Sequence, residues 1–208
     1  WALSPPTAPV GSYWYSVASS RDGTVFFAAE RTDANFAPGR IHVSTDSGTN
    51  WVRTASPADF WTYLACSSDG RTLVATTDYG KIQRSVDGGA TWKGFNVDRR
   101  WGPVGCSGDG RRMIVAPAGH QLQLSTDAGS TWSMTSTPQN ISWFRACISR
   151  GGQVMAAVDG SSKLNGGALY ISRDAGQTWI PTVFPESNLR FNWAALAMSD
   201  DGSHILLG

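Results

Sequence analysis

The stretch Ser85-Val86-Asp87-Gly88-Gly89-Ala90-Thr91-Trp92 decides the fold, because three further versions of it occur in the chain. They span residues 44–51, 125–132 and 172–179, and all four follow the pattern S-x-D-x-G-x-[TN]-W. The Asp carboxylate can accept hydrogen bonds from backbone N–H groups two or more residues on, and the Gly supplies a positive φ. The Thr favours a strand, and the Trp buries a large apolar face beside it. The pattern therefore predicts a tight turn between two strands.

The ten tryptophans fall into two series that mark an internal repeat. Four close the turns just described, and Trp1 takes the same place at the start of the chain. The other five each lie nine residues before a glycine: Trp14, Trp61, Trp101, Trp143 and Trp193. Each is followed by a short strand, a turn of the Asp-Gly or Gly-Gly type and an apolar strand, and such a turn is a strong hairpin signal. One repeat thus holds four antiparallel strands over about 40 to 50 residues.

Repeats of this length and strand number are typical of β-propeller blades. No segment carries an apolar stripe of helical spacing over a useful length. We expect an all-β fold, a β-propeller of four-stranded antiparallel blades that is five-bladed with an incomplete or composite last blade. The whole chain, 1–208, would form a single domain with repeats at about 1–50, 51–91, 92–131, 132–178 and 179–208, the last of them partial.

The four turns resemble the Asp-box of bacterial neuraminidase repeats, which recurs in the propellers of sialidases, sortilin-like receptors and some glycoside hydrolases. The positions that carry the resemblance are the aspartates, glycines and closing tryptophans: Asp46, Gly48, Trp51, Asp87, Gly89, Trp92, Asp127, Gly129, Trp132, Asp174, Gly176 and Trp179. The resemblance implies the propeller fold. It implies no particular activity, because the box is a structural turn wherever the family uses it.

The last repeat lacks its third strand, its box and its outer strand. Because Trp1 takes the place of a box tryptophan, Trp1-Ala2-Leu3-Ser4 could supply the outer strand of this blade. Three outcomes follow: a three-stranded final blade, a fragment of a longer propeller, or completion by a strand from a neighbouring molecule. The third outcome would make the protein a homo-oligomer.

The composition argues against several classes of partner and cofactor. A formal net charge of +1 gives no electrostatic attraction to nucleic acid or an anionic membrane, and no apolar run reaches the roughly 20 residues of a membrane span. The histidines lack metal-ligand spacing and nucleotide-binding motifs are absent, so we expect no metal and no cofactor. Abundant Gly, Ser and Thr with few charges predict an extracellular or secreted protein, and the start at Trp1 predicts a processed or trimmed N-terminus. Asn140-Ile141-Ser142 is a glycosylation candidate.

Two kinds of loop should emerge on one face of a propeller, which we call the loop face: those between blades and those between the second and third strands of a blade. The boxes should lie on the opposite face. The second tryptophan series begins the innermost strands and would reach the loop face, where indole rings could stack on a sugar or an extended peptide. Arg99, Arg100 and Arg190 lie in these loops. The alternative is that these tryptophans pack between blades as core.

The sequence supports no catalytic assignment. A sialidase would need three arginines for the substrate carboxylate, a Tyr nucleophile and an acid, and the chain offers only Arg40-Ile41-His42 in the wrong context. Box-bearing xyloglucan hydrolases use two acidic residues in a cleft between two propellers. A paired acid and base could come from the loop carboxylates Asp33, Asp59, Asp78, Asp98, Asp159 and Glu186, but each is better explained as a solvated loop or turn residue.

Three functions therefore remain open. The first is a non-catalytic extracellular binding or scaffold propeller that contacts a glycan or protein ligand through the loop face. The second is a glycoside hydrolase of the sialidase-like or xyloglucan-hydrolase-like type. The third is a self-assembling structural subunit completed by strand exchange.

Overall fold

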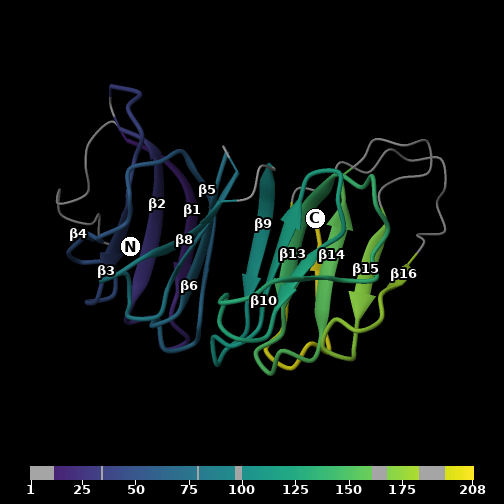
Figure 1. Ribbon diagram of the computed structural model, residues 1–208. Helices are drawn as coiled ribbons and strands as arrows, with labels where there is room; N and C mark the ends of the chain where they lie inside the picture. Colours follow the sequence, from purple (N-terminus) through teal and green to yellow (C-terminus); the bar gives the residue numbers. More distant parts are fainter. Residues whose placement is uncertain (1–11, 34, 79, 97–99, 161–167, 183–194) are drawn as a thin grey trace. The chain divides into compact units, whose positions relative to one another are not determined.

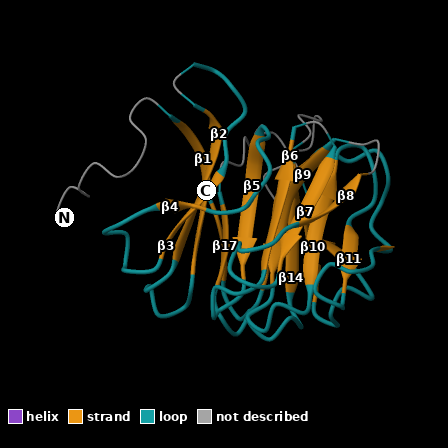
Figure 2. Ribbon diagram, turned by 60° about the vertical axis from the view of Figure 1, so that its left-hand side comes forward, coloured by secondary structure: helices purple, strands orange, loops and turns teal. Residues whose placement is uncertain are grey.

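The computed structural model describes residues 12–33, 35–78, 80–96, 100–160, 168–182 and 195–208 (Figure 1). The chain forms two compact units, Trp1–Arg100 and Trp101–Gly208, and each is described by itself. The described residues form strands, turns and loops but no helix (Figure 2). This confirms the all-β prediction, whereas the single domain stays a prediction.

Unit one contains two four-stranded antiparallel sheets, which we call blades one and two. In each sheet the strands lie side by side in chain order. Blade one consists of β1 (Tyr13–Ser19), β2 (Phe26–Thr32), β3 (Ile41–Ser44) and β4 (Val52–Arg53). Blade two consists of β5 (Trp61–Cys66), β6 (Leu73–Thr77), β7 (Lys81–Ser85) and β8 (Lys93–Asn96).

Unit two contains two further sheets of this kind and one smaller sheet. Blade three consists of β9 (Trp101–Cys106), β10 (Met113–Pro117), β11 (Gln123–Ser125) and β12 (Ser133–Met134). Blade four consists of β13 (Trp143–Ile148), β14 (Met155–Asp159), β15 (Leu169–Ser172) and β16 (Ile180–Thr182). The fifth repeat forms a two-stranded sheet of β17 (Leu196–Met198) and β18 (Ile205–Leu207) in its described residues.

The second tryptophan series marks the first strand of each described four-stranded blade, as predicted. Trp61, Trp101 and Trp143 are the first residues of β5, β9 and β13, and Trp14 is the second residue of β1. The apolar second strands β6, β10 and β14 are buried along their whole length. A strand covered on both faces reads as a continuous apolar run, which explains why these segments do not alternate.

Apolar side chains pack between consecutive blades of the same unit. In unit one, Phe27 and Ile41 of blade one share a buried cluster with Trp61 of blade two. In unit two, blades three and four share an equivalent cluster around Trp143 and Met155. Burial of such large apolar side chains is the dominant stabilising term, so each blade depends on its neighbour for its core.

Blade two illustrates the hydrogen bonds of the predicted turn, which we call a box turn. Ser85 Oγ donates to Asp87 Oδ1 over 2.7 Å and accepts from the Gly89 N–H over 2.9 Å. The carboxylate also accepts from the Thr91 N–H over 2.8 Å, and Trp92 Nε1 donates to the Gly89 carbonyl over 3.1 Å. The Thr91 hydroxyl, the Thr91 N–H and the Ser85 hydroxyl lower the pKa of Asp87 to about 2. The Ser, Asp and Gly bonds recur in the turns at 44–51, 125–132 and 172–179.

Each box turn holds two residues with positive φ, whereas the pattern predicts only the glycine. The residue before that glycine also lies in the left-handed region: Ser47 at 58°, Gly88 at 70°, Ala128 at 56° and Ala175 at 60°. An L side chain in this region costs about 1 to 2 kcal/mol. Blade two therefore has the unstrained version of the turn, and the other three carry strain.

Exchanging residues at this position should change stability in opposite directions. Ala175→Gly is expected to raise the free energy of unfolding by roughly 0.5 to 1 kcal/mol, because the strain relieved exceeds the chain entropy that glycine adds. Gly88→Ala should lower it by a similar amount, since a Cβ there meets no atom closer than 3.9 Å and only the backbone is strained. Urea denaturation of both variants measures the two changes. A change of the same sign in the free energy of unfolding of both variants would contradict the backbone strain at this position.

A buried or half-buried serine anchors every turn between the first and second strands, and the sequence analysis missed it. Ser67 Oγ accepts from the Thr72 N–H over 2.9 Å and donates to Asp69 Oδ1 over 2.5 Å. The equivalent oxygens of Ser20, Ser107, Ser149 and Ser199 each accept from the N–H five residues on. The turn glycines have φ values from 69° to 74°, which confirms the predicted hairpins. The fifth repeat is thus built like the others through this turn.

Candidate functional site

The tryptophans expected to form a binding ring are mostly buried. Trp61 is 0% exposed, and Trp101 and Trp143 are each 7% exposed. Trp143 Nε1 donates to the His120 carbonyl over 2.8 Å, which fixes its ring further. Trp61 and Trp143 pack in clusters shared by two blades, and all three buried rings offer no free face to a sugar. Trp14 is 37% exposed and is the member of this series with an open surface, while Trp193 lies outside the described residues.

The predicted loop arginines are not brought together in the described part of the chain. Arg100 is exposed and directly precedes β9. Arg99 and Arg190 lie outside the described residues. Asn140, the glycosylation candidate, is exposed in the loop before β13 with a φ of 60°, and its modification stays a prediction.

The loop carboxylates have structural partners. Asp59 is buried and accepts from Lys81 Nζ over 2.8 Å. Asp78 forms an ion pair with Arg31. Asp33 holds a turn, and Asp159 is buried at the end of β14. Asp98 and Glu186 lie outside the described residues, so the structure does not place them.

The loop between β2 and β3 presents an aromatic ring to solvent. Asp33 builds this loop, because its Oδ1 accepts from the N–H groups of Asn35 and Ala37, each over 2.9 Å. The Asp33 N–H in turn donates to the Ala37 carbonyl over 3.0 Å. At the tip, Phe36 has a φ of 62° and a side chain 68% exposed. A large apolar residue that is both strained and mostly exposed is not part of the core, and backbone outliers of this kind cluster at binding sites.

Phe36 belongs to an exposed group at the loop end of blade one, which we call the aromatic surface: Tyr13, Trp14, Tyr15 and Phe36. The rings of Tyr13 and Phe36 stack with centroids 5.5 Å apart and an interplanar angle of 28°. Register shifts between Tyr13 and Ser16 interrupt the regular pairing of β1 with β2. Bulges of this kind re-aim side chains and are frequent beside functional sites.

A buried polar pair, Glu30 and His42, contacts the aromatic surface through Trp14. Glu30 and His42 have their side chains 2% and 3% exposed, and Glu30 Oε2 lies 3.3 Å from His42 Nε2. Glu30 also accepts from Ser12 Oγ and from the Arg40 N–H. The Trp14 ring meets the His42 ring edge-on with centroids 5.1 Å apart. The pair therefore fixes Trp14 in place through His42.

Burial and hydrogen bonding set the pKa of both buried groups. Burial of Glu30 opposes its ionisation, but the bonds from Ser12, His42 and Arg40 outweigh this and hold its pKa below the usual 4.5. Burial lowers the pKa of His42 below 6.5, although the carboxylate of Glu30 acts in the opposite direction. The pair consequently favours a carboxylate beside a neutral imidazole at neutral pH.

Sequence reasoning missed Glu30, His42 and Phe36. One signal was present for Glu30, since a lone acidic residue that ends an apolar strand must find buried partners or leave the sheet. Phe36 gave no signal, because its exposure depends on the turn that Asp33 builds.

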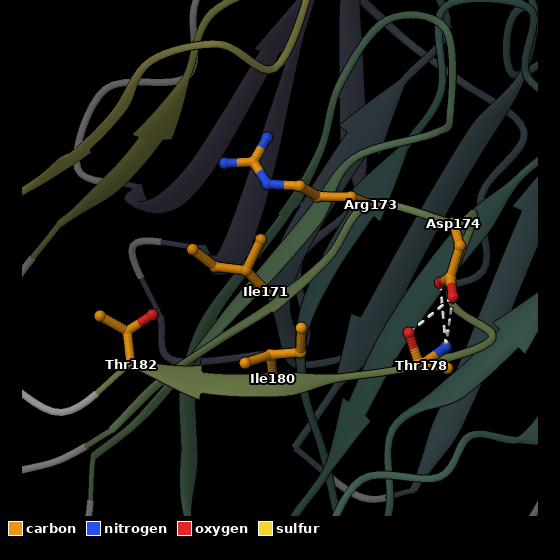
Figure 3. A pocket seen from close by; sticks show the side chains of 6 residues that line it. All are labelled: Ile171, Arg173, Asp174, Thr178, Ile180 and Thr182. Atoms are coloured by element: carbon orange, nitrogen blue, oxygen red, sulfur yellow. Dashed lines mark hydrogen bonds between the residues drawn. The ribbon is translucent and has the colours of Figure 1, made fainter.

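Unit two contains a hollow of about 350 Å³ beside the outer strands of blade four. Figure 3 shows Ile171, Ile180 and Thr182 on these strands and Arg173 at the end of β15. The hollow reaches the box turn, where Asp174 accepts hydrogen bonds from Thr178.

The described residues offer neither a metal-binding cluster nor a membrane-spanning helix. They contain no group of three or more His, Cys, Asp or Glu side chains that could hold a metal ion. In the same part of the chain, no helix has the length and apolar character needed to cross a membrane.

Comparison with known proteins supports the fold. No protein-family model and no curated protein matches the chain in sequence. Among solved structures, a GH74 enzyme from Niastella koreensis matches with a TM-score of 0.71 and 16% sequence identity, over 93% of this chain and 33% of that one. The chain thus spans about a third of the length of the structure it matches. Because GH74 is a β-propeller family, the match and the four-stranded sheets identify a β-propeller fold, as predicted; the number of blades stays a prediction.

Proposed function

We propose that this chain is an extracellular Asp-box propeller that binds a carbohydrate at the aromatic surface of blade one, without catalysis. The stacked Tyr13 and Phe36 rings, held open to solvent by the Asp33 turn, are the observation that carries the proposal. Aromatic rings stack well on the apolar faces of sugars, and a rigid platform binds them at a low entropic cost. The box turns, with their repeated Ser–Asp–Gly hydrogen bonds, support the assignment to the Asp-box type.

The charges beside the aromatic surface favour a neutral ligand. Arg31 lies over the Tyr15 ring at 5.1 Å and is paired with Asp78. Lys81 is paired with Asp59. Since a carboxylate balances each of these two cations, neither attracts an anionic ligand as an unpaired charge would. A neutral polysaccharide therefore fits it better than a sialylated or sulfated one.

Removal of one stacked ring should weaken binding strongly. Phe36→Ala is expected to reduce the affinity for a bound neutral glycan about tenfold, which corresponds to about 1.4 kcal/mol. A glycan array on the purified chain finds the ligand, and isothermal titration measures the affinities. Val52→Ala is the matched control, because Val52 is an exposed apolar residue on β4 of the same blade. Equal affinity of Phe36→Ala and Val52→Ala would contradict the proposal.

The second candidate is a glycoside hydrolase, and the structural match to a GH74 enzyme favours it. A glycosidase of the usual kind needs one carboxyl group that holds a proton and one that does not. Among the described carboxyl groups whose pKa is shifted, including Glu30, every shift is downward. This argues against a proton-holding acid among them. The proposed binding function predicts no release of reducing ends from the bound glycan; turnover abolished by Asp78→Asn would favour the hydrolase instead.

A further inference from the structure

Three side chains meet at the junction of blades one and two, and we call them the junction group: Tyr15 of β1, Arg31 of β2 and Asp78 directly after β6. The central guanidinium carbon of Arg31 lies 5.1 Å from the centre of the Tyr15 ring. Arg31 Nη2 donates to Asp78 Oδ2 and thereby links the two blades. The group is open to solvent, because Tyr15 is 56% exposed and the charged side chains are 35% and 31% exposed.

A bulge places the tyrosine of this group. The register of β1 and β2 shifts between Trp14 and Ser16, which leaves Tyr15 without a Cα partner in β2. Blades two and four shift their register at the same point, and the residues left without a Cα partner there are Thr62 and Phe144. Bulges re-aim side chains and are frequent beside functional sites. The bulge therefore belongs to the repeat, whereas the tyrosine on it is particular to blade one.

The junction of blades three and four lacks the junction group. In the repeat, the tyrosine directly follows the tryptophan of the first strand, and both charged residues lie eight residues after the glycine of the first turn. At the junction of blades three and four, these positions hold Gly102, Ala118 and Gly160. None of the three can form an ion pair or present an aromatic ring. The architecture thus forms a junction between blades without these side chains.

Other contacts hold both junctions together. Apolar clusters shared by two blades lie in each unit. The Ala55 N–H of blade one donates to the carbonyl of Gly89, in the box turn of blade two, over 3.0 Å. In unit two, Ser136 Oγ donates to the carbonyl of Gln177, in the box turn of blade four, over 3.1 Å. Because a partly exposed ion pair adds little to such contacts, stability does not explain the junction group.

The chemistry of the junction group fits the hydroxyl groups of a sugar. A carboxylate accepts hydrogen bonds, and a planar guanidinium offers five N–H donors. Two adjacent hydroxyl groups both donate and accept, so the Arg31–Asp78 pair can serve them on both sides. The charges of the pair balance each other, which suits a neutral ligand. The exposed ring of Tyr15 adds an apolar surface beside the pair.

The junction group continues the aromatic surface. Tyr15 belongs to both, and it lies two residues from Tyr13 on β1. Tyr13 pairs with Thr32, the residue that follows Arg31 on β2. The stacked rings of Tyr13 and Phe36 and the ion pair therefore lie next to each other along the same two strands. A ligand with more than one sugar unit could contact both.

We propose that Tyr15, Arg31 and Asp78 form a second sugar subsite, which binds two adjacent hydroxyl groups on one unit of a neutral oligosaccharide. Another unit of the same oligosaccharide stacks on Tyr13 and Phe36. This inference rests on the proposed carbohydrate-binding function and adds the identity of the recognised group. The ion pair acts as a specificity determinant, because a sugar unit without adjacent free hydroxyl groups leaves part of its hydrogen-bonding capacity unused.

Titration of the intact chain with three neutral hexasaccharides tests the subsite. Every internal unit of mannohexaose and xylohexaose has two adjacent free ring hydroxyl groups, whereas the internal units of laminarihexaose have none. The native chain is expected to bind one of the first two chains more tightly than laminarihexaose. Arg31→Ala/Asp78→Ala should weaken this binding at least tenfold and remove the preference, while the thermal unfolding midpoint stays close to that of the native chain. A pair with only a structural role would not change the preference.

Arg145→Ala is the matched control. Its guanidinium carbon lies 4.4 Å from the centre of the Phe144 ring, at the bulge of blade four, so the change removes a similar contact in the other unit. Its glycan affinity should equal that of the native chain. If Phe36→Ala weakens binding but the double variant binds like the native chain, the second subsite is wrong and the proposed function stands. Tighter binding of laminarihexaose than of both other chains would also overturn the subsite, and absence of binding to every neutral glycan would overturn both.

Discussion

Replacing Gly39 with alanine is expected to lower the free energy of unfolding by about 3 kcal/mol, a large effect for a single added methyl group. A Cβ on Gly39 would lie 2.1 Å from the Glu30 carbonyl oxygen and 2.6 Å from Glu30 Cγ. Backbone atoms of a buried strand cannot move aside, so the loop between β2 and β3 would have to shift. That loop holds Phe36, and glycan affinity should fall together with stability. Urea denaturation and titration of the same sample measure the two effects.

Gly151 provides the matched control for this change. A Cβ on Gly151 meets no atom within 4 Å, and neither Gly39 nor Gly151 has a positive φ, so the comparison isolates the collision. Gly151→Ala is expected to change stability by no more than about 0.5 kcal/mol. If the Gly39 and Gly151 variants unfold at the same urea concentration, the close approach of Gly39 to Glu30 is not essential.

Replacing Glu30 with leucine is the second large effect, with an expected loss of about 3 to 5 kcal/mol, as is typical when one partner of a buried pair is removed. The change removes the carboxylate that accepts hydrogen bonds from Ser12 Oγ and the Arg40 N–H. It also removes the hydrogen-bond partner of His42 Nε2. Trp14 rests edge-on against His42, so its tryptophan fluorescence should also change. Thermal unfolding gives the stability, and an unfolding midpoint equal to that of the native chain would refute the role of the pair.

The same pair gives the protein a pH dependence of known sign. Both pKa values are lower in the folded chain than their usual values of 4.5 for Glu30 and 6.5 for His42. The unfolded chain therefore binds protons more readily, and stability is complete above about pH 7 and falls as the pH decreases, first through His42 and then through Glu30. His42→Gln should remove the first part of this decline, which begins below about pH 7. An unchanged slope in that variant would show that His42 is not its source.

The sequence predicted those parts of the fold that depend on a short local pattern of residues. Ser85, Asp87 and Gly89 form their turn through bonds within eight residues, and the same chemistry at four places predicted four outer hairpins. The candidate site could not be predicted from the sequence, because it depends on contacts between segments that are distant in the chain. Whether Trp61 lies in the core or faces a ligand is decided by blade one, which packs against it. The aromatic surface likewise requires Phe36 to meet Tyr13, from another strand of the sheet.

The contact between consecutive blades is directional: the box turn of blade two lies on the outer strands of blade one, and within the other unit that of blade four lies on the outer strands of blade three. A contact of this heterologous type joins unlike surfaces, and nothing in it fixes how many times it recurs. Each of the four complete repeats has a box turn and a pair of outer strands, the two unlike surfaces of this contact. Duplication or deletion of a whole repeat would thus preserve both surfaces of this contact. The number of blades could therefore change in evolution without a new interface.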